Sequence, residues 1–174
     1  MKRKLIVITT GGTIEKSYDE VSGTLSNRGS VLFKLLKRLR LPDLEVLHRD
    51  LFCKDSLDMT DKDRQMILLA LENALADRLP IIILHGTDTM AITAQYLYDH
   101  LPELAVPVVM TGAMKPFGFE DSDALQNFTE ALAVAFLLSP GVYISMHCQV
   151  HPLPGVRKNR DRGTFESGRD IESS

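Results

Sequence analysis

Short apolar runs alternate along this chain with longer stretches in which apolar residues recur every three or four positions. The short runs are rich in β-branched residues and end at Gly, Pro or Thr, which predicts buried strands. The longer stretches carry charged residues on the opposite side, which predicts amphipathic helices. The predicted strands are residues 4–10, 44–52, 80–84, 107–110 and 142–146. The predicted helices are residues 32–39, 60–75, 90–101 and 125–136.

Strands that alternate with helices are typical of an α/β fold. Five strands and four interleaved helices predict a doubly wound, mainly parallel five-stranded sheet with helices on both faces. The run 80–84 is apolar throughout, as expected of a strand covered on both faces. After Val150 the sequence becomes polar and charged. We therefore expect one α/β domain over residues 1–150 and a polar arm or hairpin over residues 151–174.

Composition narrows the class of protein. The 174 residues suffice for one domain, and 20 Lys+Arg against 23 Asp+Glu give a net charge of -3. A nucleic-acid binder would have a basic excess, so no nucleic-acid partner is expected. No apolar run approaches the ~20 residues that span a bilayer, so no membrane association is expected. The run Leu5–Ile8 is too short for a signal peptide, which favours the cytoplasm.

Three predicted strands end in similar residues. Thr9-Thr10-Gly11-Gly12-Thr13, His85-Gly86-Thr87-Asp88-Thr89 and Thr111-Gly112-Ala113-Met114-Lys115 each combine glycine with a hydroxyl residue. Ligands of open parallel sheets bind beyond the carboxyl ends of the strands. Glycine and threonine also make ordinary turns and helix caps, which is the simpler explanation of any single end. Together the three ends favour a hydroxyl-rich pocket.

The sequence lacks the motifs of several common binding and catalytic sites. Gly11-Gly12 is neither a dinucleotide fingerprint nor a P-loop, and no H-E-x-x-H spacing indicates a metal. Cys53 and Cys148 are far apart and show no CxxC spacing. Nucleophilic catalysis by a threonine hydroxyl remains, and such a hydroxyl needs an activating group and oxyanion donors. Thr13, Thr87, Asp88 and Lys158 are the candidates for these roles.

Three stretches in order resemble the signatures of the bacterial L-asparaginase/glutaminase family. They are Thr10-Gly11-Gly12-Thr13-Ile14, His85-Gly86-Thr87-Asp88-Thr89-Met90, and Val109-Met110-Thr111-Gly112-Ala113-Met114 with Asp121-Ser122-Asp123-Ala124 and Asn127. The resemblance covers residues 4 to about 150 well and the remainder loosely. It implies the N-terminal domain fold of that family. Long-chain members carry a second α/β domain, so we expect a short-chain form or a fragment.

The resemblance also implies roles for individual residues. Thr13 is the implied nucleophile, and Tyr18 the lid tyrosine that polarises its hydroxyl. Thr87 positions water, and Lys158 tunes Thr87. Asp88 faces the α-ammonium of the substrate, and Ser56 binds its α-carboxylate. Gly12, Gly86 and Ala113 complete the implied substrate-binding set.

Each of these residues also has a structural interpretation. Asp88 suits the start of a helix, Tyr18 is compatible with an ordinary loop aromatic, and Ser56 with a turn hydroxyl. Lys158 lies among arginines, as in a solvated charged segment. Leu57 stands where the family commonly has a polar residue, and the spacing from Lys158 to Phe165 is shorter than in long-chain members. His85 is expected to be a structural hydrogen-bonding residue. Residues 16–28 form a polar stretch that we expect to act as a lid or as a passive connection.

The sequence thus predicts an L-asparaginase-like amidohydrolase. It would cleave the side-chain amide of L-asparagine through a threonyl ester, without metal or organic cofactor. The alternatives are a glutaminase or other small-amide hydrolase, and a non-catalytic amino-acid-binding domain or an amidotransferase part that needs a missing domain. Because the family associates around its sites, a homodimer or homotetramer is expected.

Overall fold

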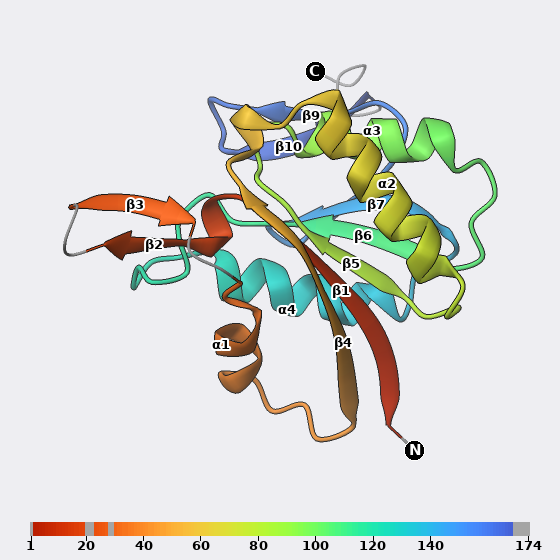
Figure 1. The fold of residues 1–174 in the computed structure, drawn as a ribbon, viewed down its shortest axis with the longest axis horizontal. Helices are drawn as coiled ribbons and strands as arrows, with labels where there is room; N and C mark the ends of the chain where they lie inside the picture. The colour runs from red at the N-terminus through yellow and green to blue at the C-terminus, as the bar shows by residue number, and fades with distance from the viewer. Residues whose placement is uncertain (1, 20–22, 28–29, 169–174) are drawn as a thin grey trace.

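The computed structural model describes residues 2–19, 23–27 and 30–168. In this part of the chain the central sheet has the strand order β4-β1-β5-β6-β7-β8 (Figure 1). The strands are β1 Arg3–Gly11, β4 Leu44–Lys54, β5 Ile81–Leu84, β6 Pro107–Thr111, β7 Gly141–Met146 and β8 Gln149–Pro152. All neighbours pair in parallel except β8, which is antiparallel to β7. The mainly parallel α/β sheet is confirmed.

The sheet differs from the sequence prediction by the sixth strand, β8. Its residues carry no apolar run, since Gln149 and Pro152 are exposed and only His151 is buried. The strand forms because the tight turn at His147 and Cys148, both with positive φ, returns the chain along β7. This hairpin was not apparent from hydrophobic periodicity, which reports burial rather than strand pairing.

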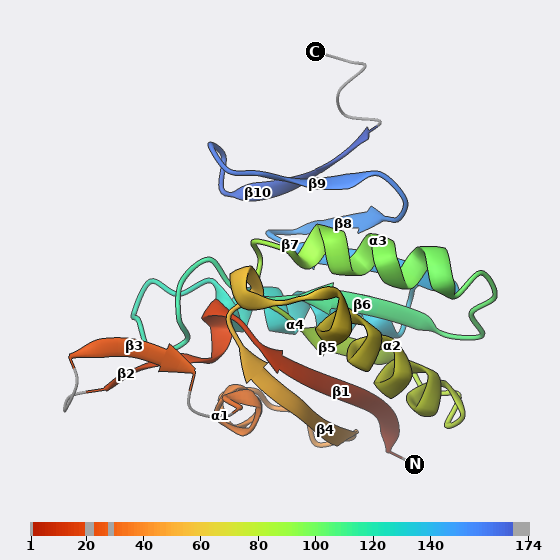
Figure 2. The same ribbon diagram turned by 45° about the horizontal axis from the view of Figure 1, so that its top comes forward.

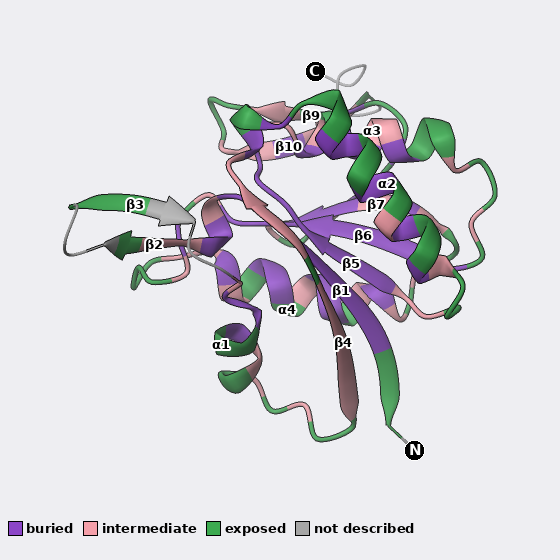
Figure 3. Ribbon diagram, viewed as in Figure 1, coloured by how far each residue is buried: buried purple, intermediate pink, exposed green. Residues whose placement is uncertain are grey.

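Four α-helices cover the two faces of the sheet (Figure 2). They are α1 Leu32–Lys37, α2 Asp61–Leu75, α3 Met90–His100 and α4 Ala124–Ala135. Ile6 and Ile8 of β1 pack with α2 and α3, whereas Leu5 and Val7 pack with α1 and α4. Helices on both faces are expected for strands that are buried on both faces, such as residues 5–11 of β1 and all of β5 (Figure 3).

The connections between the parallel strands do not all have the same hand. Strands β5, β6 and β7 lie side by side in chain order. Helix α3 joins the first pair over one face, and α4 joins the second pair over the other face. Because both connections advance in the same direction across the sheet, they have opposite hands, although nearly all such crossovers share one hand. The arrangement puts Asn127 of α4 below the end of β6, where its Nδ2 donates to Gly112 O at 3.0 Å.

Two hairpins of the described residues lie outside the central sheet: one projects from it, and the other lies beyond its β8 edge (Figures 1 and 2). One pairs β2 Lys16–Asp19 with β3 Thr24–Asn27, where the sequence had suggested a polar loop; residues 20–22 and 28 of that stretch lie outside the described ones. The other pairs β9 Val156–Asn159 with β10 Thr164–Ser167. Phe165 anchors it, fully buried in the cluster below α2 and α3. The division of the chain at residue 150 remains a prediction.

Candidate active site

The carboxyl ends of β1, β5 and β6 lie against one another. Thr10 Oγ1, at the end of β1, donates a hydrogen bond to Leu84 O of β5 at 2.9 Å. The backbone N–H of His85 donates to Thr111 O of β6, also at 2.9 Å. The hydroxyl-rich strand ends that the sequence singled out therefore meet at one edge of the sheet, because parallel strands all end there.

Glycines allow these backbones to approach closely. A Cβ atom on Gly12 would lie 2.3 Å from Gly86 N, and one on Gly86 would lie 2.5 Å from Ser56 Oγ. Gly12 also has a φ of 87°, which side chains disfavour. Thr13 and Thr87 directly follow these two glycines. The two threonines therefore leave the sheet at the same place, with Thr13 half-buried and Thr87 buried.

A lysine from the far end of the chain reaches this place. Lys158 of β9 donates from Nζ to Thr87 Oγ1 at 2.8 Å and to Asp88 Oδ1 at 2.9 Å. The Lys158 side chain is only 14% exposed, because the β9–β10 hairpin holds it over the end of β5. The structure therefore brings together three of the candidate residues from two distant segments.

Arg160 is a member of this cluster that the sequence treated as part of a solvated charged segment. Its Nη1 donates to Asp88 Oδ1 at 3.0 Å, beside the bond from Lys158. Arg160 lies just beyond β9, two positions after Lys158. The two-residue period of a strand, which puts such positions on one side, was the signal that could have found it.

Ser56 lies on the other side of Gly86, at the start of a 3₁₀ turn over Ser56–Asp58. It is buried, and its carbonyl accepts a hydrogen bond from Thr89 Oγ1 at 2.8 Å. The preceding residue, Asp55, caps the turn and forms an ion pair with Lys16 at the base of the β2–β3 hairpin. The hydrogen bond from Lys16, together with that from the Leu57 N–H, lowers the Asp55 pKa against the effect of burial. This loop therefore connects Ser56 to the segment that follows Thr13.

Two other predicted residues lie apart from this cluster. Tyr18 is on the projecting β2–β3 hairpin and is 63% exposed. Ala113 follows β6, and its side chain is buried in the apolar cluster beneath α1 and α4, so its backbone is the part available to a ligand.

Two buried ionisable side chains flank the strand ends. Complete burial lowers the pKa of His85 to about 4, so its imidazole is neutral near pH 7. The ring Nδ1 lies 2.7 Å from Gly86 O, to which the neutral ring donates. Burial raises the pKa of Glu15, two residues after Thr13, to about 7, against hydrogen bonds that favour the charged form. The hydrogen bond to Gly86 O is consistent with the structural role expected of His85, which stays a prediction.

The connection from β6 to α4 is held by Asp123. Its carboxylate accepts the backbone N–H groups of Met114 and Lys115 at 3.0 Å and lies 2.8 Å from His147 Nε2. Burial raises the pKa of Asp123, but these hydrogen bonds outweigh it and hold the pKa below its usual range. The network fixes the backbone just after Gly112.

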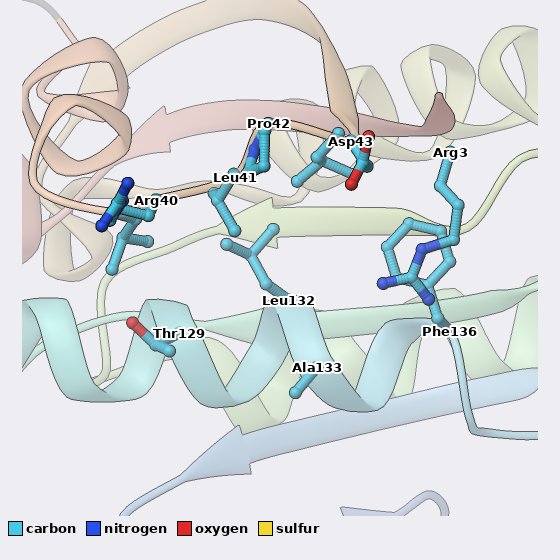
Figure 4. Close-up of a pocket in the computed structure, with 11 residues that line it drawn as sticks. Arg3, Arg40, Leu41, Pro42, Asp43, Thr129, Leu132, Ala133 and Phe136 are labelled. Atoms are coloured by element: carbon cyan, nitrogen blue, oxygen red, sulfur yellow. The ribbon is translucent and has the colours of Figure 1, made fainter. Parts of the chain in front are cut away.

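Other features of the surface lie away from these strand ends. An apolar hollow of about 460 Å³ lies between the segment that precedes β4 and helix α4, at the amino end of β1, with Arg3 stacked on Phe136 (Figure 4). A hollow of about 590 Å³ between α3 and β9 borders Asp88. Within the described residues there is no cluster of three or more His, Cys, Asp or Glu suited to a metal ion. None of the described helices is both long and apolar enough to cross a membrane.

Several known proteins are similar to this chain in sequence and fold. The family model described as "Asparaginase, N-terminal" matches residues 4–170. L-asparaginase 1 of Escherichia coli K12 is 39% identical over 139 residues, which are 77% of this chain and 40% of that protein. A glutamyl-tRNA(Gln) amidotransferase subunit of Thermoplasma acidophilum is 30% identical over 179 residues, 99% of this chain and 42% of that protein. The solved structure of the thermostable L-asparaginase from Thermococcus kodakarensis has a TM-score of 0.84 at 31% identity, covering 94% of this chain and 51% of that one. The chain thus spans about half the length of these relatives or less.

Proposed function

The chain belongs to the asparaginase family, and on that premise we propose that it hydrolyses the side-chain amide of L-asparagine to L-aspartate and ammonia. One observation carries the proposal. Gly12 and Gly86, which directly precede Thr13 and Thr87, lie against each other, and Lys158 binds the Thr87 hydroxyl. A hydroxyl nucleophile with a second, lysine-bound hydroxyl next to it is an arrangement suited to acyl transfer.

In the first half of the reaction Thr13 Oγ attacks the amide carbon. The C–N bond breaks, the hydroxyl proton of Thr13 ends on the departing nitrogen, and ammonia leaves a threonyl ester behind. Tyr18 polarises the Thr13 hydroxyl when the β2–β3 hairpin closes. Excluding bulk water at this stage strengthens the electrostatic interactions in the site.

In the second half a water molecule attacks the ester carbon. Thr87 Oγ1 positions this water by accepting a hydrogen bond from it, and the ammonium of Lys158 stabilises the charge that develops there. The ester bond breaks, the carboxylic acid is released, and the water proton passes to Thr13 Oγ.

The remaining polar groups orient the amino acid. Asp88 faces the α-ammonium and Ser56 the α-carboxylate, while Gly12 and Gly86 let the backbone approach the amide. Ser56 packs against Gly86, and Asp88 follows Gly86 by two residues, so the two side chains can hold the two ends of a small substrate around the threonines. We further propose a cytoplasmic enzyme that acts as a homodimer or homotetramer.

The test of the nucleophile is Thr13→Ala, compared with Thr87→Ala and with Thr129→Ala on the exposed surface of α4, whose hydroxyl bonds only within its own helix. Ammonia release from L-asparagine is expected to be lost in Thr13→Ala and retained in Thr129→Ala, with the circular dichroism spectrum unchanged. Mass spectrometry of the acid-quenched wild-type enzyme is expected to find the ester on Thr13. Retained activity in Thr13→Ala with loss in Thr87→Ala would reverse the assignment.

A second candidate is the ammonia-producing part of an amidotransferase. It is favoured by the match to the Thermoplasma amidotransferase protein, which covers 99% of this chain. The same assay separates the two: an asparaginase releases ammonia from asparagine on its own. An amidotransferase part binds the amide and releases ammonia only when a partner protein is added. Assaying glutamine in parallel distinguishes an asparaginase from a glutaminase.

A further inference from the structure

We infer that Arg160 determines specificity: its guanidinium occupies the position on Asp88 that a substrate α-ammonium would take, so that the site gains little from an α-ammonium. The substrate class then extends to side-chain amides that lack a free α-ammonium, such as succinamate, which is asparagine without its amino group. This inference rests on the proposed function, in which Asp88 faces that ammonium.

The charges around Asp88 support this assignment. A single carboxylate oxygen, Oδ1, accepts from Lys158 Nζ at 2.9 Å and from Arg160 Nη1 at 3.0 Å. One negative charge is therefore already matched by two positive ones. A third cation approaching the same carboxylate is repelled by both, and the repulsion is strengthened by the partial burial of the group.

The two cations that bind Asp88 differ in how far their side chains are exposed to solvent. The Lys158 side chain is 14% exposed and also bound to Thr87, so it belongs to the interior of the site. The Arg160 side chain is 66% exposed and covers Asp88 from the solvent side. A substrate ammonium that approaches Asp88 from the solvent would therefore compete with Arg160 rather than with Lys158.

The turn of the β9–β10 hairpin and its other side chains determine where Arg160 points. Asn159 closes the turn by accepting a hydrogen bond from the backbone N–H of Arg162 at 3.0 Å, and Gly163 has a φ of 60°. The neighbouring arginines, Arg157 and Arg162, both bind Glu166 at 3.5 Å. They are thereby drawn to β10, whereas Arg160 is directed to Asp88.

The experiment compares L-asparagine with succinamate in Arg160→Ala, with Arg162→Ala as the matched control. Arg162 has the same charge, a side chain 68% exposed and a place on the same hairpin, but it binds Glu166. Arg160→Ala is expected to raise the asparagine-to-succinamate ratio of kcat/KM by about fivefold or more, through a lower KM for asparagine, as for the loss of a partly exposed charge-assisted bond. Arg160→Lys and Arg162→Ala are expected to keep the wild-type ratio.

Two results would overturn the inference. An unchanged or lower ratio in Arg160→Ala would mean that Arg160 either binds the substrate carboxylate or does not compete. An equal rise of the ratio in Arg162→Ala would show that the ratio depends on the overall charge and not on the contact between Arg160 and Asp88. Calorimetric binding of L-aspartate and succinate to the same variants makes the comparison without turnover. If neither the wild type nor the variants release ammonia, the proposed function alone is contradicted. The ratio of L-aspartate to succinate affinity then still decides the role of Arg160.

Discussion

Lys158 Nζ lies 2.8 Å from Thr87 Oγ1, across a sequence separation of 71 residues. Because the lysine binds the hydroxyl that is proposed to position water and stabilises the charge that develops there, Lys158→Gln is expected to lower kcat by about 10²–10³-fold with little change in KM, as for the loss of one electrostatic donor. Steady-state ammonia release measures this. Lys37→Gln, on the exposed side of α1, is the control and is expected to keep normal kinetics. A normal kcat in Lys158→Gln would remove the lysine from the catalytic set.

The β2–β3 hairpin is expected to act as a lid. Tyr18 lies on this hairpin and is 63% exposed, and the proposed role of its phenol requires closure over Thr13. Tyr18→Phe is expected to reduce kcat while KM stays similar, and asparagine is expected to slow proteolysis within residues 16–28. Tyr98→Phe, on the exposed surface of α3, serves as the control. Normal turnover in Tyr18→Phe without substrate protection would show that the hairpin is a passive connection.

The close approach of Gly12 to Gly86 is expected to tolerate no side chain. Gly12→Ala combines a φ of 87° with a Cβ 2.3 Å from Gly86 N, and we expect a loss of about 2–4 kcal/mol in the free energy of unfolding. Gly163→Ala isolates the backbone effect, since Gly163 has a φ of 60° but no atom within 4 Å of the added Cβ. It is expected to lose about 1 kcal/mol. Urea unfolding measures both, and equal losses would contradict the packing explanation.

Glu15 and His85 are expected to give opposite pH dependences of stability. The pKa of Glu15 is raised from 4.5 to about 7, chiefly by burial, with Asp50 adding to the effect. The contribution of Glu15 to the free energy of unfolding is therefore full below pH 4.5 and is lost as the pH rises through 7. The pKa of His85 is lowered from 6.5 to about 4, chiefly by burial, with Arg64 adding to the effect. Its contribution is full above pH 6.5 and is lost as the pH falls through 4.

Between pH 4.5 and 6.5 the two slopes nearly cancel, so the wild-type free energy of unfolding is expected to change little. Over its whole pH range, each titration changes the free energy of unfolding by about 3 kcal/mol. Glu15→Gln should expose the His85 slope, with stability falling on acidification, and His85→Gln should expose the Glu15 slope, with stability falling as the pH rises. Chemical unfolding at several pH values checks this, and parallel curves for the wild type and both variants would contradict it.

A closed homo-oligomer is expected in solution. Large apolar side chains are exposed at several places, among them Leu137 at 81% and Leu57 at 64%. Leu57 directly follows Ser56, so a neighbouring protomer that covers it also borders the candidate site. Light scattering combined with activity measurements tests the expectation. A fully active monomer would contradict it.

Much of the fold followed from local pattern. The apolar runs marked β1, β5, β6 and β7, and the 3.6-residue periodicity marked the helices, because burial on one or both faces leaves its period in the sequence. The helix predicted over residues 60–75 is α2, and the Thr60 N–H at its start donates to Asp63 Oδ2 at 2.8 Å, a local contact between residues three positions apart. The meeting of three Gly/Thr strand ends needed only the rule that parallel strands end at one edge.

Other features were decided by tertiary structure. The added strand β8 and the opposite hand of the connection through α4 depend on which elements pack together, and periodicity does not encode that choice. The sequence named Lys158 as a candidate but did not place it, and the packing of Phe165 brings its hairpin over Thr87. The same packing brings the Arg160 side chain, whose sequence context suggested a solvated charge, into hydrogen-bond distance of Asp88. The sequence by itself therefore determined which residues are buried and where strands end, since these depend on each residue and its near neighbours. Contacts between charges some seventy residues apart depend on how whole elements dock, and only the folded chain establishes them.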